Sequence, residues 1–373
     1  MARAAVCTLL LSCGEAAALF DDRLEIVVGQ SATHDDNVFR LARGVDPVAA
    51  LGTSDQGDTY HATSVGLELD GHRGSFDWTF TGADVLTTRV GYTESRTLAA
   101  LSNIQGGTQS TAANFIDYRR AYVDASYEIT PRWALRAEVG RGAQENSAPL
   151  YALSDLRVTT ERLELAYATP AGTRIGIDTR FIDGRLPNRQ IVAAQAIDNS
   201  YDEVESGAFI EWQTSRHSRL DARLGRVRRG YDDLGIRNYT GSTYRLAYAW
   251  QPVDALTLTA ILQRGISATE EVNVGFVLSE SAGLRAHWRH ADRVELNFDV
   301  ENGDRVYRGD PLFALGLVPE RSERVSLTAV HGLLHVTPVV TLDFSWRNER
   351  RSANAAGGNY RVNIAGIGVR CSF

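Results

Sequence analysis

The sequence contains no lysine, one methionine and three cysteines among its 373 residues. All 39 basic side chains are therefore arginines, which a G+C-rich genome explains more simply than a mechanism does. Arginine-rich blocks are also missing, and the formal net charge is −7. Since affinity for nucleic acid depends on clustered contacts to phosphate groups, these features argue against a nucleic-acid partner.

Long apolar runs are also missing after the N-terminus. Charged residues make up 23% of the chain and hydrophobic residues 43%, and no stretch approaches the length of a membrane-spanning helix. The composition therefore excludes a helical membrane protein. It leaves open a chain that crosses a membrane with strands.

The N-terminal segment resembles an export signal. An apolar run follows one arginine, and small residues up to Ala18 suit signal peptidase, so residues 1–18 are predicted to be a signal peptide and residues 19–373 a single domain. Cys13 follows Leu-Leu-Ser, which leaves lipoprotein processing as an alternative. After cleavage near Ala18, Cys371 is the one remaining cysteine, so neither an intramolecular disulfide nor a multi-cysteine metal site is expected.

Apolar and charged residues alternate with a period of two over whole segments, which is the pattern of strands with one apolar and one polar face. Four clear examples are RWALRAEVG (132–140), TRIGIDTRF (173–181), RVELNFDVE (293–301) and VVTLDFSWR (339–347). The polar face is charged on nearly every strand, as a water-filled or salt-bridged lumen would allow. The candidate lumen-lining charges are Arg136, Glu138, Arg174, Asp178, Arg180, Glu295, Asp299, Glu301, Asp343, Arg347 and Arg370.

Short turns alternate with long connections along the chain, which indicates a barrel with tight turns at one end and longer loops at the other. A soluble β-sandwich or propeller would also show alternating strands. The charged face, tryptophans near the short turns and the alternating C-terminal strand that ends at Phe373 favour the barrel. Phe373 is interpreted as a signal for the barrel assembly machinery.

These features predict an all-β fold: a transmembrane, antiparallel, up-and-down outer-membrane β-barrel of about 16 strands, with 18 possible. The weakest part of the count is the stretch 74–97, which is taken as one strand although it is too long for a standard one. An extra turn near residues 82–84 would change the number of strands.

Two groups of residues are candidates for chemistry. His34, Asp35, Asp36 and Asn37 follow the first strand and could supply ligands to calcium, but a loop held by Asp and Asn side chains is the favoured interpretation. The pairs His331 with His335 and His287 with His290 lack further ligands, so neither predicts a metal site. No G-x-S-x-G motif is present, and neither a cofactor nor a catalytic residue is predicted, although a triad assembled across strands stays possible.

Tyrosines near the predicted loops could serve as stacking platforms for sugars, and ordinary packing at the membrane interface is an equally good interpretation. They are Tyr201, Tyr231, Tyr239 and Tyr307.

Several segments resemble one protein family in the same order along nearly the whole chain. They are THDDNVFRL (33–41), LPNRQ (186–190), SYDEVE (200–205), SRLDARLG (218–225), YTGSTYRLAYAWQP (239–252) and ERRSANAAGGNYR (349–361). They are similar to the exopolysaccharide-biosynthesis outer-membrane proteins called EpsL, a group of β-barrel porins often associated with exosortase systems. The resemblance implies a barrel with a role in exopolysaccharide secretion or assembly. It transfers no catalytic residue, and the stretch 74–97 looks shorter than the family pattern.

The leading hypothesis is an outer-membrane barrel of a Gram-negative bacterium that acts as a channel or accessory for exopolysaccharide export. A general diffusion porin is the first alternative, and a barrel-embedded hydrolase or lipid-modifying enzyme is the second. The expected partners are outer-membrane lipid, polysaccharide and, during biogenesis, the barrel assembly machinery.

Overall fold

The computed structural model describes residues 24–69, 75–82, 85–98, 104–105, 108–109, 114–192, 195–233, 235–267, 275–291, 293–309, 319–354 and 358–372. Residues 1–18, Phe373 and Cys13 lie outside this part, so the predicted signal peptide, assembly signal and lipoprotein site stay predictions. No helix within the described residues is long and apolar enough to cross a membrane.

Seventeen strands form one large antiparallel sheet. They are β1 (Leu24–Asp35), β2 (Asp58–Leu69), β3 (Ser75–Gly82), β4 (Leu86–Leu98), β7 (Phe115–Thr130), β8 (Trp133–Asn146), β9 (Leu156–Ala168), β10 (Arg174–Arg185), β13 (Tyr201–Ser215), β14 (Ser218–Tyr231), β15 (Tyr239–Val253), β16 (Leu256–Ser267), β17 (Phe276–His290), β18 (Val294–Arg308), β19 (Ser322–His335), β20 (Val340–Ala353) and β21 (Tyr360–Ser372). Two short hairpins stand apart from it: β5 (Ile104–Gln105) with β6 (Thr108–Gln109), and β11 (Gln190–Val192) with β12 (Gln195–Ile197).

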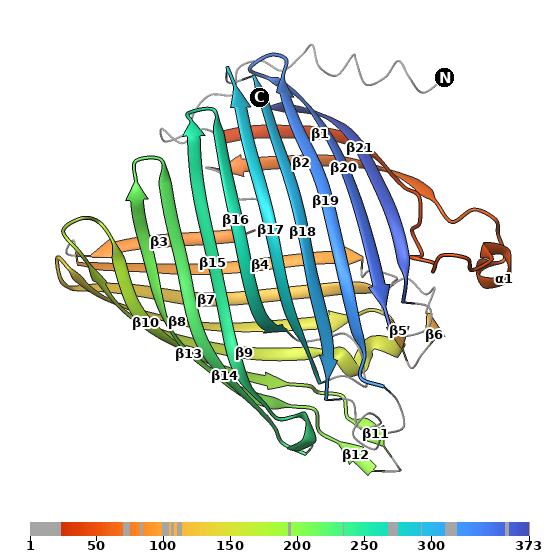
Figure 1. Ribbon diagram of the computed structural model, residues 1–373, viewed down its shortest axis with the longest axis horizontal. Coiled ribbons are helices and arrows are strands. Elements are labelled where there is room, and N and C mark those ends of the chain that lie inside the picture. Colours follow the sequence, from red (N-terminus) through yellow and green to blue (C-terminus); the bar gives the residue numbers. More distant parts are fainter. Residues whose placement is uncertain are drawn as a thin grey trace.

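The large sheet curves into a barrel (Figure 1). Strands from β3 to β21 pair with their neighbours in chain order, and β21 then pairs with β1, which also pairs with β2. In Figure 1 the green and blue strands form the front wall, and the red to yellow strands cross behind them. The up-and-down antiparallel barrel predicted from the period of two is thereby confirmed.

The stretch 74–97 differs from its prediction as one strand. It forms two strands, β3 and β4, with a turn around residue 85, and Phe80 opposite Thr88 shows that they form a hairpin. The turn follows Gly82, next to the position identified as the weak point of the count. A single strand of that length would greatly exceed the usual strand length, so the reversal adds one strand to the predicted sixteen.

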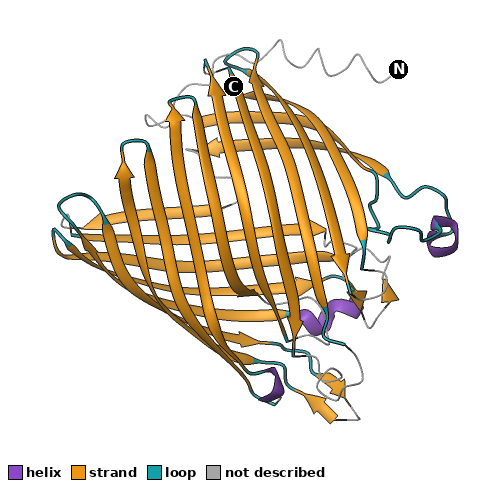
Figure 2. Cartoon of the chain, viewed as in Figure 1, coloured by secondary structure: helices purple, strands orange, loops and turns teal. Residues whose placement is uncertain are grey.

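The two rims of the barrel differ. At one rim the strands are joined by tight turns, such as the one between Thr130 and Trp133. The opposite rim carries the longer connections and, within the described residues, the short helices α1 (Pro47–Leu51), η2 (Pro149–Ser154) and η3 (Gly235–Arg237) (Figure 2). Tight turns join paired strands at one rim, and long connections join them at the other. The predicted asymmetry between the two ends is therefore present.

The alternation of side chains gives the barrel two chemically different faces. Large apolar side chains such as Ile177, Leu224 and Ile367 are exposed on the outward parity, whereas carboxylates such as Glu164 and Glu203 are buried on the inward parity. Exposed tryptophans lie near the tight turns on three strands. They are Trp133, Trp212 and Trp250. An aromatic belt at one edge of an apolar outer band is typical of transmembrane barrels.

Candidate pore interior

A continuous series of ion pairs covers one inner wall of the barrel. It runs over β9, β10, β13 and β14 and alternates five carboxylates with five guanidinium groups, so its formal charge is zero. From the tight-turn rim the order is Glu211, Arg174, Glu164, Arg162, Asp178, Arg223, Glu205, Arg180, Glu203 and Arg229. We call these ten residues the charge ladder.

The register of the strands produces the charge ladder. Asp178 on β10 faces Glu164 on β9, and Arg180 faces Glu205 on β13, so residues of one inward parity meet across strands. Most of the contacts are close: Arg223 lies 2.6 Å from Glu205 and 3.1 Å from Asp178. Because buried charges must be compensated by partners, the alternating order allows four nearly inaccessible carboxylates on one wall.

The loop-side end of the charge ladder is its most buried part. Arg229 is 3% exposed and lies 2.7 Å from the Glu203 carboxylate, which is 2% exposed. The Arg229 guanidinium also lies 4.1 Å from the centre of the Tyr201 ring. This combination of an ion pair with a cation–π contact fixes the wall just below the long loops.

A second buried cluster lies on β18 to β21, centred on the Glu323 carboxylate. Arg321 and Arg351 both pair with Glu323, and the Tyr307 hydroxyl donates a hydrogen bond to it over 2.9 Å. The Tyr360 hydroxyl donates to Glu349. These side chains hold the opposite wall near the same rim.

A polar cavity of about 1,110 Å³ lies against this second cluster. Four carboxylates and four guanidinium groups of inward-facing residues line it, so their formal charges balance. They are Asp35, Asp58, Glu301, Glu349, Arg40, Arg305, Arg347 and Arg351. Glu280 and Asp304 also border the cavity, but they lie on the outward parity, where they pair with Arg264 and Arg324. Among the described residues, neither Glu301 nor Arg305 has an ion-pair partner within 4.0 Å, so both charges are available to a passing solute or ion.

The charges predicted to line the lumen all lie on the inward parity. Arg174, Asp178 and Arg180 come together in the charge ladder, and Glu301 and Arg347 line the same cavity. The others occur singly or in separate pairs. Arg136 pairs with Asp124, Glu138 with Arg120 and Asp299 with Arg285, while Glu295, Asp343 and Arg370 lie near the tight-turn rim.

The predicted tyrosine platforms behave in two ways. Tyr201 and Tyr231 are buried, with ring centroids 5.7 Å apart, and pack against Phe276. Their rings are therefore closed to stacking by a sugar. Tyr239 packs on Phe276, and only Tyr307 of the four lies at the polar cavity.

The motif at residues 34–37 forms a clamped loop. Asp35 pairs with Arg40 at 2.8 Å, and the Asn37 side chain bonds the backbone of Leu41 and Arg361. The Asp36 carboxylate accepts two bonds from Asn363. These contacts match the favoured interpretation of a loop held by its own Asp and Asn side chains. Over the described part of the chain, no group of three or more His, Cys, Asp and Glu could hold a metal ion.

The long loops are tied together by Arg237, a residue that the sequence reasoning missed. Its side chain is 1% exposed; Nε donates to the Gly309 carbonyl over 2.9 Å, and another nitrogen donates to Asn199. The carboxylate of the neighbouring Asp198 accepts a hydrogen bond from the Ser200 backbone N–H. Hydrogen bonds from the side chain and backbone of Ser200 hold the pKa of the Asp198 carboxyl below the ordinary value of 3.8. No local motif marks Arg237, because its partners come from distant loops.

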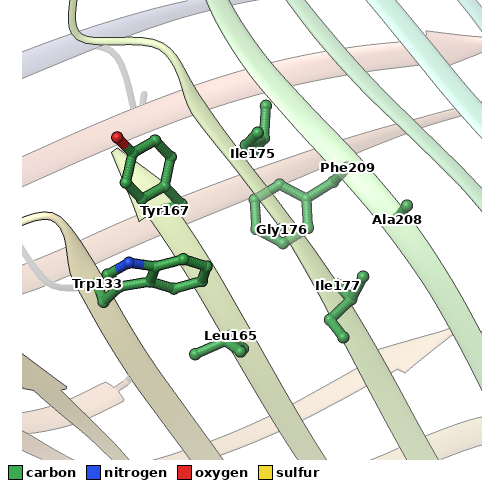
Figure 3. Close-up of a pocket in the computed structure, with 8 residues that line it drawn as sticks. All are labelled: Trp133, Leu165, Tyr167, Ile175, Gly176, Ile177, Ala208 and Phe209. Carbon is green, nitrogen blue, oxygen red and sulfur yellow. The ribbon is translucent and has the colours of Figure 1, made fainter. Parts of the chain in front are cut away.

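A different kind of hollow lies on the outer face near the tight-turn rim (Figure 3). It has a volume of about 540 Å³ and contains no titratable group except the Tyr167 phenol. Trp133 and Tyr167 lie side by side there, with ring centroids 5.1 Å apart. The hollow is part of the apolar outer band and has no groups suited to acid–base chemistry.

Comparison with known proteins supports a porin. The model of the family described as "Putative beta-barrel porin 2" matches residues 177–373, which is 197 of the 373 residues. No curated protein matches the chain. The matched region contains β13 to β21 and therefore much of the charge ladder and the whole second cluster.

Two solved porin structures share the fold. A BenF-like porin from Pseudomonas fluorescens Pf-5 is 10% identical, with 95% of this chain and 100% of that chain covered and a TM-score of 0.50. OccK9 (OpdG) from Pseudomonas aeruginosa is 11% identical, with 95% and 99% covered and a TM-score of 0.50. At such low identity the likeness concerns the fold alone.

Proposed function

This chain belongs to that β-barrel porin family, it lies in the outer membrane of a Gram-negative bacterium, and we propose that it is a diffusion porin for small hydrophilic solutes. The observation that carries the proposal is the polar cavity of about 1,110 Å³ beside the charged inner walls. Such an interior offers hydrogen bonds and compensated charges to a hydrated solute, while the outer face is apolar. The protein acts as a channel and catalyses no reaction.

The charge balance of the interior sets the expected selectivity. The charge ladder is neutral, and the inward-facing charges of the cavity lining balance as well. Neither cations nor anions are therefore attracted strongly into the cavity. We expect little discrimination between potassium and chloride.

Exopolysaccharide export is less well supported as the function. The resemblance of several segments to EpsL proteins suggests it, but the matching family and the BenF-like structure above are described as porins. Diffusion of small solutes accounts for the interior with fewer assumptions. A deletion strain should therefore secrete polymer normally.

Planar lipid bilayers test the porin proposal. The purified, folded protein should insert as discrete ohmic conductance steps, and a potassium chloride gradient should give a reversal potential close to zero. Protein whose barrel has been unfolded by heat is the control and should give no steps. Insertion without any conductance would refute the proposal.

A further inference from the structure

The outer face carries a basic surface on β7 to β10. Five arginines on β7 to β10 line a hollow of about 410 Å³ together with Tyr92 and Asp183. Arg120 lies on the inward parity and pairs with Glu138. The other four are Arg119, Arg141, Arg157 and Arg185. We call these four residues the arginine patch. All four lie on the outward parity. Nearer the tight turns, the same outward face carries apolar side chains.

The strand register gathers the arginine patch from four different strands. Arg119 on β7 lies opposite Ala143 on β8, which lies opposite Arg157 on β9, which lies opposite Arg185 on β10. Arg141 belongs to the next row toward the tight turns, opposite Thr159. Ala143 and Thr159 are small, so the hollow between the guanidinium groups stays open.

Two members of the arginine patch are uncompensated. Arg119 lies 3.4 Å from Glu145 and Arg185 lies 2.5 Å from Asp183, so these two arginines have carboxylate partners. Arg141 and Arg157 are exposed, and neither has an ion-pair partner among the described residues. Like charges held together without partners repel one another unless an anion lies between them.

One acidic residue limits the patch on its lower side. Glu161 is exposed one row nearer the tight turns than Thr159, and it has no ion pair among the described residues. Glu161 repels an anion, so an anion bound in the hollow lies on the side of the long loops. The ligand is therefore restricted to the height of the arginine patch.

The depth of the arginine patch places it at the outer membrane surface. Arg141 is eight residues from Trp133 along β8, or roughly 27 Å at about 3.4 Å per residue, which a strand tilt of about 40° reduces to roughly 21 Å along the membrane normal. The apolar band of such barrels is about 25 Å tall, so Arg141 lies close to its upper edge. The row below holds the exposed apolar side chains of Val123, Val139 and Phe181, with Glu161 between the last two. This side faces the outer leaflet, because long loops are extracellular.

We propose that the arginine patch binds the phosphate groups of lipopolysaccharide in the outer leaflet. Guanidinium groups bind phosphate through paired charge-assisted hydrogen bonds, and Arg141 and Arg157 offer these groups at the level of the lipid headgroups. The apolar side chains of Val123, Val139 and Phe181 in the row beneath contact the acyl chains of the same lipid. The bound glycolipid thereby compensates charges that the protein leaves without partners.

Binding of fluorescent lipid A to the detergent-purified full chain tests the proposal. Bisphosphorylated lipid A should bind, and the double variant Arg141→Gln/Arg157→Gln should bind it at least about tenfold more weakly, a difference of about 1.4 kcal/mol. Removing the phosphates from lipid A should weaken binding to the native chain by a similar factor. Inorganic phosphate at the same concentration should fail to compete, because it lacks the acyl chains.

The matched control is Arg324→Gln, which removes an exposed outward arginine that already pairs with Asp304. It should bind lipid A as the native chain does. Folding of each variant is checked by the heat-dependent shift of the barrel band in gels. Equal binding by the double variant and the native chain, or equal binding of phosphorylated and dephosphorylated lipid A, would overturn the proposal. Full competition by inorganic phosphate would also overturn it.

Discussion

Replacing Arg229 by methionine should destabilise the barrel by about 3 kcal/mol. The change keeps an apolar stem of similar length but removes the guanidinium group that bonds the Glu203 carboxylate at 2.7 and 2.8 Å. Leaving a buried charge without its partner costs about 3–5 kcal/mol. We expect the lower end of this range, because Arg180 stays 3.6 Å from Glu203.

The assay for this prediction is equilibrium unfolding by guanidinium chloride in lipid vesicles, followed by tryptophan fluorescence. The double variant Glu203→Gln/Arg229→Met removes both charges and should recover most of the loss, because no buried carboxylate is left uncompensated. Arg324→Gln breaks the exposed pair with Asp304 and should change the free energy of unfolding by less than about 1 kcal/mol. The reasoning fails if Arg229→Met costs less than about 0.5 kcal/mol, or if the double variant is less stable than the single one.

Three further predictions concern selectivity, packing and pH. Glu301→Gln should shift the reversal potential toward anion preference and Arg305→Gln should shift it toward cation preference, since each removes one unpaired charge from the cavity. Shifts in the same direction would contradict this. Gly176→Ala should lower the free energy of unfolding by about 1–3 kcal/mol, because the added Cβ would overlap the Leu165 carbonyl and lie 2.6 Å from the Phe209 ring. The control is Gly265→Ala, whose Cβ meets nothing within 4 Å and which should therefore cost less. The pKa of Asp198 is lowered in the folded state, so the stability that its carboxylate contributes is present above pH 3.8 and is lost as the pH falls through the folded-state pKa. Asp198→Asn should therefore be less stable than the native chain at pH 6, and the difference should disappear in acid.

The sequence predicted the faces of the strands better than the contacts between them. A period of two identifies which residues share a face, and residues such as Asp178 and Arg180 lie on the inward parity as expected. Which acid meets which arginine depends on strand register, which turn geometry and barrel stagger determine together. Glu203 and Arg229 are 26 residues apart, and no local pattern links them.

The parts that the sequence could not predict depend on long-range packing. The stretch 74–97 has alternating residues on both sides of its turn, so the period of two continues through the reversal and hides it. Arg237 is similar, because a single arginine in a loop is normally exposed. Its burial depends on Asn199 and Gly309, which reach it from other loops.

The most direct test of the porin proposal is the swelling of proteoliposomes in solutions of neutral sugars. A diffusion pore should admit a pentose such as arabinose quickly and a tetrasaccharide such as stachyose much more slowly, because the rate is set by solute size against the width of the interior. Vesicles prepared without protein provide the baseline. Swelling rates equal to that baseline for every sugar, with the protein inserted and folded, would contradict the account.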